Sequence, residues 1–435
     1  MEISELYDLY RKCGSLTTDS RNITRGAMFF ALKGEKFDGN SFAAQALEAG
    51  ARYAIVDRPT LAGMKAGRGE CILVENVLST LQEIALYHRS QFDIPVLGIT
   101  GTNGKTTTKE LISAVLSKKY VTVATRDNFN NDIGVPLTLL RIDGRTQIAV
   151  VEMGASAPGE IASLTRLVQP TCGLVTNVGK AHILGFGSLE GVKKTKGELY
   201  NYLRQSGGAV FYNADSGHLT EMINSNKGIV PRPYGIKLQG VEILSPTAES
   251  PYLSIQLPDG GPRISTKLVG DYNADNVMAA LAVGSHFGVP TADAVRAIEG
   301  YRPSNDRSQM VKTSRNTLIV DTYNANPTSM EAAIRNFSRI DFQNKTLILG
   351  DMLELGGESA AEHSRILEMA MALNADILLV GEEFTSACEK AGCNAKCFAT
   401  SDLLAEELRR APLEGRSILI KGSHGIHLEK LPEVL

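Results

Sequence analysis

Tryptophan is absent from this chain, and tyrosine and phenylalanine occur only 13 times each among its 435 residues. Proteins that hold single-stranded nucleic acid usually stack bases on aromatic side chains, so this composition does not favour such a partner. The net charge of −3 gives no general attraction for nucleic acid or anionic lipid. No apolar run approaches the roughly 20 residues that span a bilayer, and residues 1–12 are too polar for a signal peptide. We therefore expect neither a nucleic-acid partner nor membrane insertion.

Cysteine is also scarce, and the six cysteines are scattered. Cys388, Cys393 and Cys397 lie close together but lack the Cys-x-x-Cys spacing of metal and redox sites. We expect ordinary thiols here and a cytoplasmic location, because thiols persist in a reducing compartment. The last third of the chain has no Gly-x-Gly-x-x-Gly after its first predicted strand, so dinucleotide binding is not indicated.

The most informative segment is Gly98-Ile-Thr-Gly-Thr-Asn-Gly-Lys-Thr-Thr-Thr108. An apolar run precedes it, and apolar residues at helical spacing follow it, which predicts a strand, a glycine loop and a helix. Glycines let the backbone approach an anion, and the start of a helix offers free N–H groups to it. Lys105 would reach the terminal phosphates of a nucleotide, and the hydroxyl of Thr106 or Thr107 would hold Mg²⁺. The loop is a variant, because Ile99 stands where the strict Walker pattern has glycine.

Further polar residues follow predicted strands of the same region. Residues 147–151 form an apolar run that ends on Glu152, and residues 173–176 form another, followed by Asn177 and then His182. Parallel α/β sheets place their chemistry at such strand ends, and a carboxylate there can hold nucleotide-bound Mg²⁺. Taken singly, each of these residues could equally be a solvated strand end or a structural histidine.

The alternation of predicted strands and helices begins anew near residues 92 and 303. These two points divide the chain into three predicted domains of an α/β protein. We expect a small α/β domain over 1–92, a central domain with a P-loop ATPase-like parallel sheet over 93–303, and a Rossmann-like doubly wound sheet over 304–435. The last domain alternates four apolar strands, near 317–320, 346–349, 377–380 and 417–420, with four helical segments. An alanine-rich helix over 271–287 should present Asn273 and Asn276 on one face, since they are three residues apart.

Together these motifs resemble the Mur ligase family, whose members form amide bonds at the expense of ATP during peptidoglycan precursor synthesis. The resemblance spans the whole chain, and its branch-specific motifs are those of the ligases that add D-alanyl-D-alanine to UDP-N-acetylmuramoyl-tripeptide. The matching segments are Asp19-Ser-Arg21, Thr100–Thr107, Asn128–Pro136, Glu152–Ala155, His182–Ser188, Lys196-Gly-Glu198, Asn273–Asn276, Asp321-Thr-Tyr-Asn-Ala-Asn-Pro327, Gly350-Asp-Met-Leu-Glu-Leu355 and Lys421-Gly-Ser423.

The resemblance implies a role for each matched residue. Catalytic roles fall to Lys105, Glu152, His182, Lys196 and Arg307, and magnesium would be held by Thr106, Glu152, His182 and Lys196, the last as a carbamate. ATP would be bound by Gly101, Thr102, Asn103, Gly104, Lys105, Thr106, Thr107, Asn273, Asn276, Arg307 and Asp321. The other substrates would be bound by Asp19, Ser20, Arg21, Asn130, Asn131, Asn324 and Asn326. Ser423-His-Gly-Ile-His427 is richer in histidine than the family pattern, and no role is assigned to it.

The implied protein is a monomeric ligase that uses ATP and Mg²⁺, with UDP-N-acetylmuramoyl-tripeptide and D-alanyl-D-alanine as its other substrates. Several alternatives stay open at this point. They are another Mur-type ligase, a folylpolyglutamate-type ligase, a P-loop nucleotide switch and a non-catalytic UDP-sugar binding protein. A guanine-binding switch would carry Asn-Lys-x-Asp, but neither Asn226-Lys227 nor Asn344-Lys345 continues to that motif.

Overall fold

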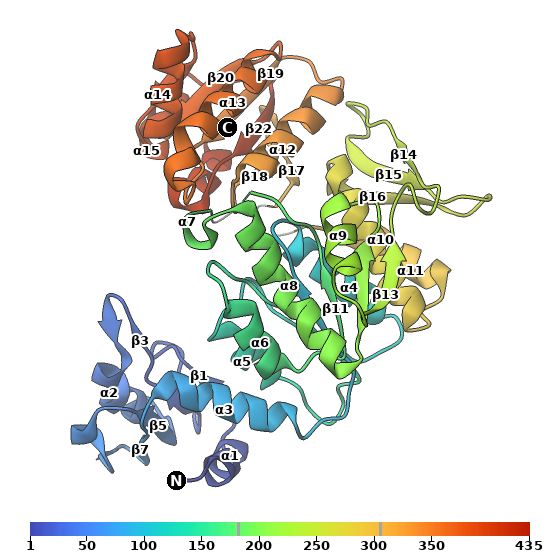
Figure 1. Ribbon diagram of the computed structural model, residues 1–435. Helices are drawn as coiled ribbons and strands as arrows, with labels where there is room; N and C mark the ends of the chain where they lie inside the picture. Colours follow the sequence, from blue (N-terminus) through green and yellow to red (C-terminus); the bar gives the residue numbers. More distant parts are fainter. Residues whose placement is uncertain (181–182, 304–306) are drawn as a thin grey trace.

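The computed structural model describes residues 1–180, 183–303 and 307–435, and they form three α/β units around three main sheets (Figure 1). The C-terminal unit lies at the top of Figure 1, the N-terminal unit at the lower left, and the central unit joins them. The predicted boundaries at 92 and 303 fall in segments between regular elements and stay predictions. The sequence led us to expect an α/β protein with parallel sheets, and this is confirmed.

The N-terminal unit is built on a five-stranded sheet of order β1-β2-β5-β7-β6, with a β3-β4 hairpin beside it. Its longest helix, α3, begins where the Asn76 side chain accepts the Ser79 N–H (2.8 Å) and ends at Arg89. Arg89 is buried and donates to the Val168 carbonyl (3.1 Å), which ties this unit to the central one. The elements are α1 Ile3–Arg11, β1 Leu16–Thr17, β2 Met28–Phe30, β3 Lys33–Gly34, β4 Phe37–Asp38, α2 Ala43–Glu48, β5 Tyr53–Val56, β6 Lys65–Ala66, β7 Gly69–Leu73 and α3 Val77–Arg89.

The central unit is built on a six-stranded, all-parallel sheet of order β13-β12-β11-β8-β10-β9. The strand that leads into the glycine loop, β8, is buried in the middle, between β10 and β11, so Glu152 and Asn177 follow its two neighbours. The elements of this sheet and its helices are β8 Val96–Thr100, α4 Lys105–Leu116, β9 Thr122–Ala124, α5 Gly134–Leu139, β10 Ile148–Glu152, α6 Glu160–Val168, β11 Cys172–Val175, α7 Ile183–Phe186, α8 Leu189–Ser206, β12 Ala209–Asn213, α9 Gly217–Asn224 and β13 Val230–Tyr234.

A second, antiparallel sheet in the same unit was not expected from the sequence. It consists of β14 Glu242–Leu244, β15 Tyr252–Gln256 and β16 Arg263–Val269, in that order. Helices α10 Ala274–His286 and α11 Thr291–Gly300 follow it and pack with α4 in one apolar core, which holds the phosphate-loop helix from behind. The helix predicted over 271–287 is therefore present.

The C-terminal unit has a six-stranded sheet of order β17-β18-β22-β19-β20-β21, with apolar cores on both faces. Alternate residues of β18 face opposite sides: Ile319 joins one core, and Leu318 and Val320 join the other. The four strands expected to be parallel are so, and the edge strand β17 adds an antiparallel pair that was not expected. The elements are β17 Gln309–Lys312, β18 Thr317–Asp321, α12 Pro327–Arg339, β19 Lys345–Gly350, α13 Ser359–Met371, β20 Asp376–Val380, α14 Glu382–Ala391, β21 Lys396–Phe398, α15 Ser401–Arg410 and β22 Ser417–Lys421.

The cysteines of this unit differ from the expectation of ordinary thiols. Cys388, on α14, forms a disulfide with Cys393 just beyond the end of that helix, whereas Cys397 is free. The prediction was therefore wrong for two of the six cysteines. The reason is that α14 ends at Gly392 in the left-handed conformation (φ 61°), which turns the chain back and brings the Cα atoms of Cys388 and Cys393 to 5.1 Å.

Candidate active site

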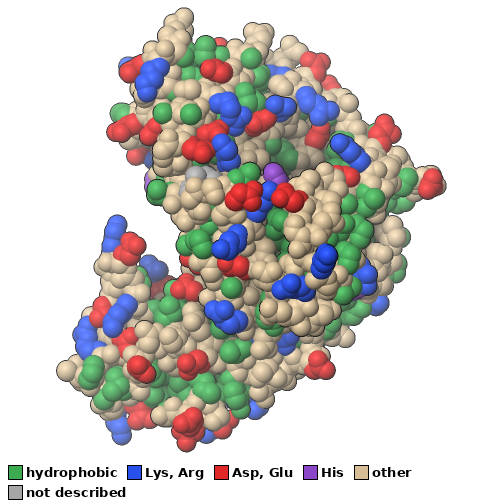
Figure 2. Space-filling model, viewed as in Figure 1, with side chains coloured by type: hydrophobic (Ala, Val, Ile, Leu, Met, Phe, Trp, Pro, Cys, Tyr) green, Lys and Arg blue, Asp and Glu red, His purple; other side chains and the backbone are tan. Residues whose placement is uncertain are grey.

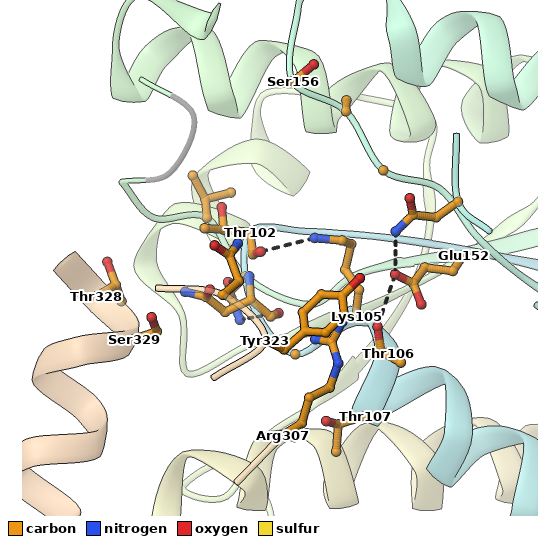
Figure 3. Close-up of a pocket in the computed structure, with 18 of the residues that line it drawn as sticks. Thr102, Lys105, Thr106, Thr107, Glu152, Ser156, Arg307, Tyr323, Thr328 and Ser329 are labelled. Carbon is orange, nitrogen blue, oxygen red and sulfur yellow. Dashed lines mark hydrogen bonds between the residues drawn. The ribbon is translucent and has the colours of Figure 1, made fainter. Parts of the chain in front are cut away.

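A cavity of about 1130 Å³ lies where the central and C-terminal units meet, and the phosphate loop forms part of its wall. Figure 3 shows its residues converging from the loop helix, from the end of β10 and from α12 of the C-terminal unit. On the face drawn in Figure 2, the molecule is also deeply notched between its N-terminal and C-terminal units. A cavity lined by several strand ends and a helix start is where an α/β protein is expected to bind a nucleotide.

The glycine loop adopts a conformation that only glycine tolerates at two positions. Gly101 has φ of +147°, and a Cβ there would lie 2.0 Å from the Thr176 hydroxyl oxygen. Gly104 has φ of +76°, and its Cβ would lie 2.7 Å from the Asn276 side-chain oxygen. In the described part of the chain no side chain caps α4, so the N–H groups of its first turn are available to an anion.

Lys105 is folded back over this loop. Its ammonium donates to the carbonyl oxygens of Gly101 (2.9 Å) and Thr102 (3.1 Å), and these two bonds place the charge at the mouth of the loop. Loss of hydration inside the cavity lowers the pKa of Lys105, and the Arg307 cation lowers it further, against the opposing charge of Glu152. A cation held this way gains strongly from an anion such as a phosphate.

Glu152 supplies an incompletely paired carboxylate beside the loop. Its Oε1 accepts bonds from the Thr106 hydroxyl (3.2 Å) and from the Asn130 amide (2.8 Å), as Figure 3 shows for Thr106. Its Oε2 is buried and has no hydrogen-bond partner among the described residues. A buried, unpaired carboxylate oxygen is costly, and a cation satisfies it.

These donors fit Mg²⁺, which proteins usually hold through one or two carboxylates together with substrate phosphates and water. Within the described ranges, no three acidic, histidine or cysteine side chains gather into a ready-made metal site. The nucleotide and water would therefore provide most of the magnesium ligands, and Glu152 and Thr106 would be the ligands from the protein. His182, also predicted to serve magnesium, lies outside the described residues.

Lys196 lies on α8, is 2% exposed, and is not among the residues that line the cavity. Its Nζ lies 5.3 Å from the centre of the Phe186 ring. Burial lowers the pKa of Lys196 to about 7, with a further contribution from the charge of Lys105. A large fraction of this lysine is therefore the neutral amine near neutral pH, which is the form that can react with carbon dioxide.

Glu198, in the same motif, has a role that the sequence did not suggest. Its carboxylate accepts the N–H groups of Gly159 (2.9 Å) and Ala162 (2.8 Å) at the start of α6. This anchors the segment from Glu152 to Gly159, which lines the cavity. The partners are up to 39 residues apart, so no local pattern could have revealed the contact.

From the C-terminal unit, Arg307 and Asp321 reach the cavity as expected. The Arg307 guanidinium lies 3.5 Å from the centre of the Tyr323 ring, and Lys421 donates to Asp321 (2.6 Å) and to the Asn324 carbonyl (3.1 Å). Lys421 is 1% exposed, so it fixes the Asp321 carboxylate from within the sheet. Sequence reasoning had not singled out Tyr323, although its ring is central in Figure 3.

Asn273 and Asn276 line the cavity, and their side chains are linked behind the loop helix. Asn276 accepts from the Thr108 hydroxyl (2.9 Å) and donates to Asn273 (2.8 Å), which donates to the Val269 carbonyl (2.8 Å). These bonds brace α4 against α10. Contact of the two asparagines with adenine stays a prediction.

Of the asparagines predicted to bind the other substrates, Asn130, Asn131 and Asn324 line the cavity and Asn326 does not. Asn131 accepts the Gly134 N–H at the start of α5, and Asn324 accepts the Ala325 N–H (both 2.8 Å). Asn326 is nearly buried and caps α12 through the Ser329 N–H (2.9 Å). It also donates to the Asn103 side chain (2.7 Å), which is a direct link from the C-terminal unit to the phosphate loop.

Asp19, Ser20 and Arg21 are not brought to this cavity. They form a turn before β2 in which Arg21 donates twice to the Asp19 carboxylate (2.9 and 3.0 Å), and these bonds lower the pKa of Asp19 to about 2. Of the described N-terminal residues, only Gln82 lines the cavity. A substrate that contacts both this turn and the cavity must therefore extend from the N-terminal unit to the central unit.

Three family models match the chain, in the order in which its three units follow one another. The description "Mur ligase family, catalytic domain" matches residues 13–89, "Mur ligase middle domain" matches 99–284, and "Mur ligase, glutamate ligase domain" matches 306–424. No helix within the described residues is both long and apolar enough to traverse a bilayer.

Similar proteins cover nearly the whole chain. The UDP-N-acetylmuramoyl-tripeptide–D-alanyl-D-alanine ligase of Escherichia coli is 35% identical over 97% of this chain and 93% of its own length. A crystal structure of MurF from Acinetobacter baumannii superposes with a TM-score of 0.84 at 30% identity, covering 99% of this chain and 97% of that one. MurF ligase from Thermotoga maritima, solved in complex with ADP, gives a TM-score of 0.83 at 25% identity, covering 98% and 97%.

Proposed function

The chain belongs to the Mur ligase family of ATP-dependent ligases, and from this we propose that it joins D-alanyl-D-alanine to UDP-N-acetylmuramoyl-tripeptide, giving a UDP-pentapeptide precursor of peptidoglycan. The observation that carries the proposal is the phosphate loop with Lys105 and Glu152, which faces a cavity closed by the C-terminal unit. The names of relatives that match nearly the full length support this choice of substrates over those of other Mur ligases.

The proposed reaction has two steps. The terminal carboxylate of the tripeptide attacks the γ-phosphorus of ATP, which forms an acyl phosphate and releases ADP. The amine of the dipeptide then attacks the acyl carbon, loses a proton as the amide forms, and phosphate leaves. The first step brings two anions together, and the second brings a neutral amine to the acyl carbon, so the site must supply positioning and charge stabilisation rather than a covalent nucleophile.

The residues of the chain divide this work between two units. Lys105 and the first-turn N–H groups of α4 hold the phosphates, while Thr106 and Asn130 orient the Glu152 carboxylate. When bound at Glu152, Mg²⁺ would offset the negative charge that the carboxylate and the phosphates share. Arg307 and Asn326 bring the C-terminal unit over the phosphate loop, which keeps water from the acyl phosphate.

We also propose that the protein works as a monomer in the cytoplasm, where both nucleotide substrates are expected. The Cys388–Cys393 disulfide joins residues only five positions apart, so it closes a short loop, and its reduction should change the fold little.

A competition experiment tests the choice of amine. When D-alanyl-D-alanine, meso-diaminopimelate and D-alanine compete in one tube with ATP and UDP-tripeptide, we expect the dipeptide adduct to dominate by mass spectrometry. A site that hydrogen-bonds the internal amide should reject amines that lack it, because its polar groups would be left unpaired. A second tube supplies the UDP-dipeptide precursor. If diaminopimelate addition to that precursor is the dominant product, the branch assignment is wrong.

A second prediction concerns Lys196, whose neutral amine can form a carbamate. Lys196→Ala should lose most activity and regain part of it with short-chain carboxylates, which can occupy the vacated volume. Lys196→Arg should stay inactive, because a guanidinium is not carbamylated. Since burial lowers the pKa of Lys196 to about 7, recovery of a CO₂-depleted enzyme should be faster at pH 8 than at pH 6 when the two reactions are held at the same concentration of dissolved CO₂. Full activity of Lys196→Arg would contradict the carbamate.

A further inference from the structure

A second cavity, of about 240 Å³, lies next to the large one and shares three of its lining residues, Thr106, Arg307 and Tyr323. The remaining lining residues are Asp127, Asn128, Thr322 and His424. Cavities for drug-sized ligands occupy about 300–1,000 Å³, so this space suits a smaller molecule. The mechanism described above makes no use of it, and His424 had no role in the sequence analysis.

The charges around this small cavity are divided between the two units that enclose it. The central unit contributes the carboxylate of Asp127, and the C-terminal unit contributes the guanidinium of Arg307 and the imidazole of His424. Asp127 and Arg307, both described, form no ion pair with each other. A ligand that carries both an ammonium and a carboxylate would complement the two sides.

Two polar groups at the cavity also lack partners. Thr322 is 1% exposed, and its hydroxyl oxygen is buried without a hydrogen bond to any described residue. The same is true of the Arg307 Nε. Buried polar atoms in folded proteins are nearly always paired, and leaving one unpaired costs stability. Both atoms would be satisfied by an oxygen-rich group placed in the cavity.

Arg307 and His424 are held in place by one aromatic side chain, Tyr323. The Tyr323 ring contacts the Arg307 guanidinium at 3.5 Å from its centre and stacks on the His424 ring, with centres 6.1 Å apart and planes inclined by 25°. Arginine fixed on an aromatic face keeps its N–H groups directed outward for a carboxylate. His424 therefore belongs to a prearranged group and not to a free loop.

We propose that this small cavity binds the amine substrate, a zwitterionic dipeptide, with its carboxylate at Arg307, His424 and Thr322 and its amino end toward Asp127. The inference rests on the proposed function and assigns a subsite to it. Thr106 lines both cavities and lies 3.2 Å from Glu152, so the small cavity opens beside the proposed site of phosphate transfer. His424 determines specificity for the free carboxylate of the dipeptide.

The test compares two histidines of one loop in the full-length enzyme. His424→Ala should raise the KM for D-alanyl-D-alanine at least tenfold, with the KM values for ATP and UDP-tripeptide changed less than twofold. His427→Ala is the matched control, because His427 is exposed, pairs with Glu429 and does not line the cavity. It should leave all three values within twofold. Asp127→Asn, on the opposite unit, should raise the dipeptide KM in the same way.

A substrate variant distinguishes recognition from a structural effect. Wild-type enzyme should prefer D-alanyl-D-alanine over its C-terminal amide, and His424→Ala should reduce this preference at least fivefold in kcat/KM. If wild-type enzyme makes the pentapeptide, but His424→Ala and Asp127→Asn behave like His427→Ala, the subsite is wrong and the proposed function stands. If wild-type enzyme does not use the dipeptide at all, both proposals fail.

Discussion

Lys105→Ala should lower the rate of pentapeptide formation by at least about a hundredfold while leaving the protein folded. In this cavity the Lys105 ammonium is fixed by two carbonyl oxygens at the mouth of the loop, so its charge is already in place when ATP binds. Removing a preorganised charge from the phosphate site should cost roughly 3 kcal/mol or more in the transition state. Product formation measured by mass spectrometry, with ADP release measured in parallel, gives the rate.

The control for this variant is Lys118→Ala. Lys118 is exposed just beyond the end of α4 and does not line the cavity, so its loss removes the same charge from nearly the same segment without touching the site. We expect Lys118→Ala to have normal turnover. Circular dichroism and thermal unfolding should be alike for both variants and the wild type. Near-normal turnover of folded Lys105→Ala would overturn the assignment of the phosphate loop.

Glu152→Gln should reduce turnover by about two orders of magnitude, and the reason lies in the two different oxygens of the carboxylate. Oε1 accepts bonds from Thr106 and Asn130, and the amide oxygen of glutamine can still accept both. Oε2 has no described partner, and glutamine replaces it with an amino group that cannot ligate a cation. The substitution therefore removes the metal-binding oxygen and keeps the local hydrogen bonds.

The dependence on magnesium separates this effect from a structural one. Glu152→Gln should need a much higher Mg²⁺ concentration for half-maximal activity than the wild type, whereas its unfolding temperature should be unchanged. Asn130→Ala is a useful comparison, since it removes one of the bonds that orient Glu152 but no metal ligand. The loss of turnover in Asn130→Ala should be smaller than in Glu152→Gln, about tenfold. An unchanged magnesium requirement in Glu152→Gln would contradict the proposed metal site.

The parts of the site that the sequence predicted are those built from one continuous segment. A strand, a glycine loop and a helix follow one another between residues 96 and 116, so their spacing alone placed Lys105 and Thr106. The parallel order of the central sheet then brought Glu152 beside them, as expected for strand ends of an α/β fold. The helices of the C-terminal unit were predicted for a similar reason, since each is long and periodic.

The contacts that could not be predicted join residues that are far apart in the sequence. The Asn326–Asn103 bond spans 223 positions, and Glu198 caps a helix that begins near Gly159. Strand β14 has only three residues, and the loops that join β14 to β16 are polar and contain proline and glycine, so the antiparallel sheet was not predicted. Asp351 lies in a matched motif but had no predicted role, and its carboxylate accepts the Glu383 and Phe384 N–H groups at the start of α14.

The position of Asn326 at the start of α12 has an electrostatic consequence. Because α4 begins in the phosphate loop and α12 begins beside it, the positive ends of two helix dipoles, one from each unit, lie at the wall of the same cavity. A bound triphosphate is therefore attracted by both units at once and favours the arrangement in which they meet. Loss of the γ-phosphate weakens that attraction, so the charge of the nucleotide itself sets how firmly the C-terminal unit stays in place before and after the reaction.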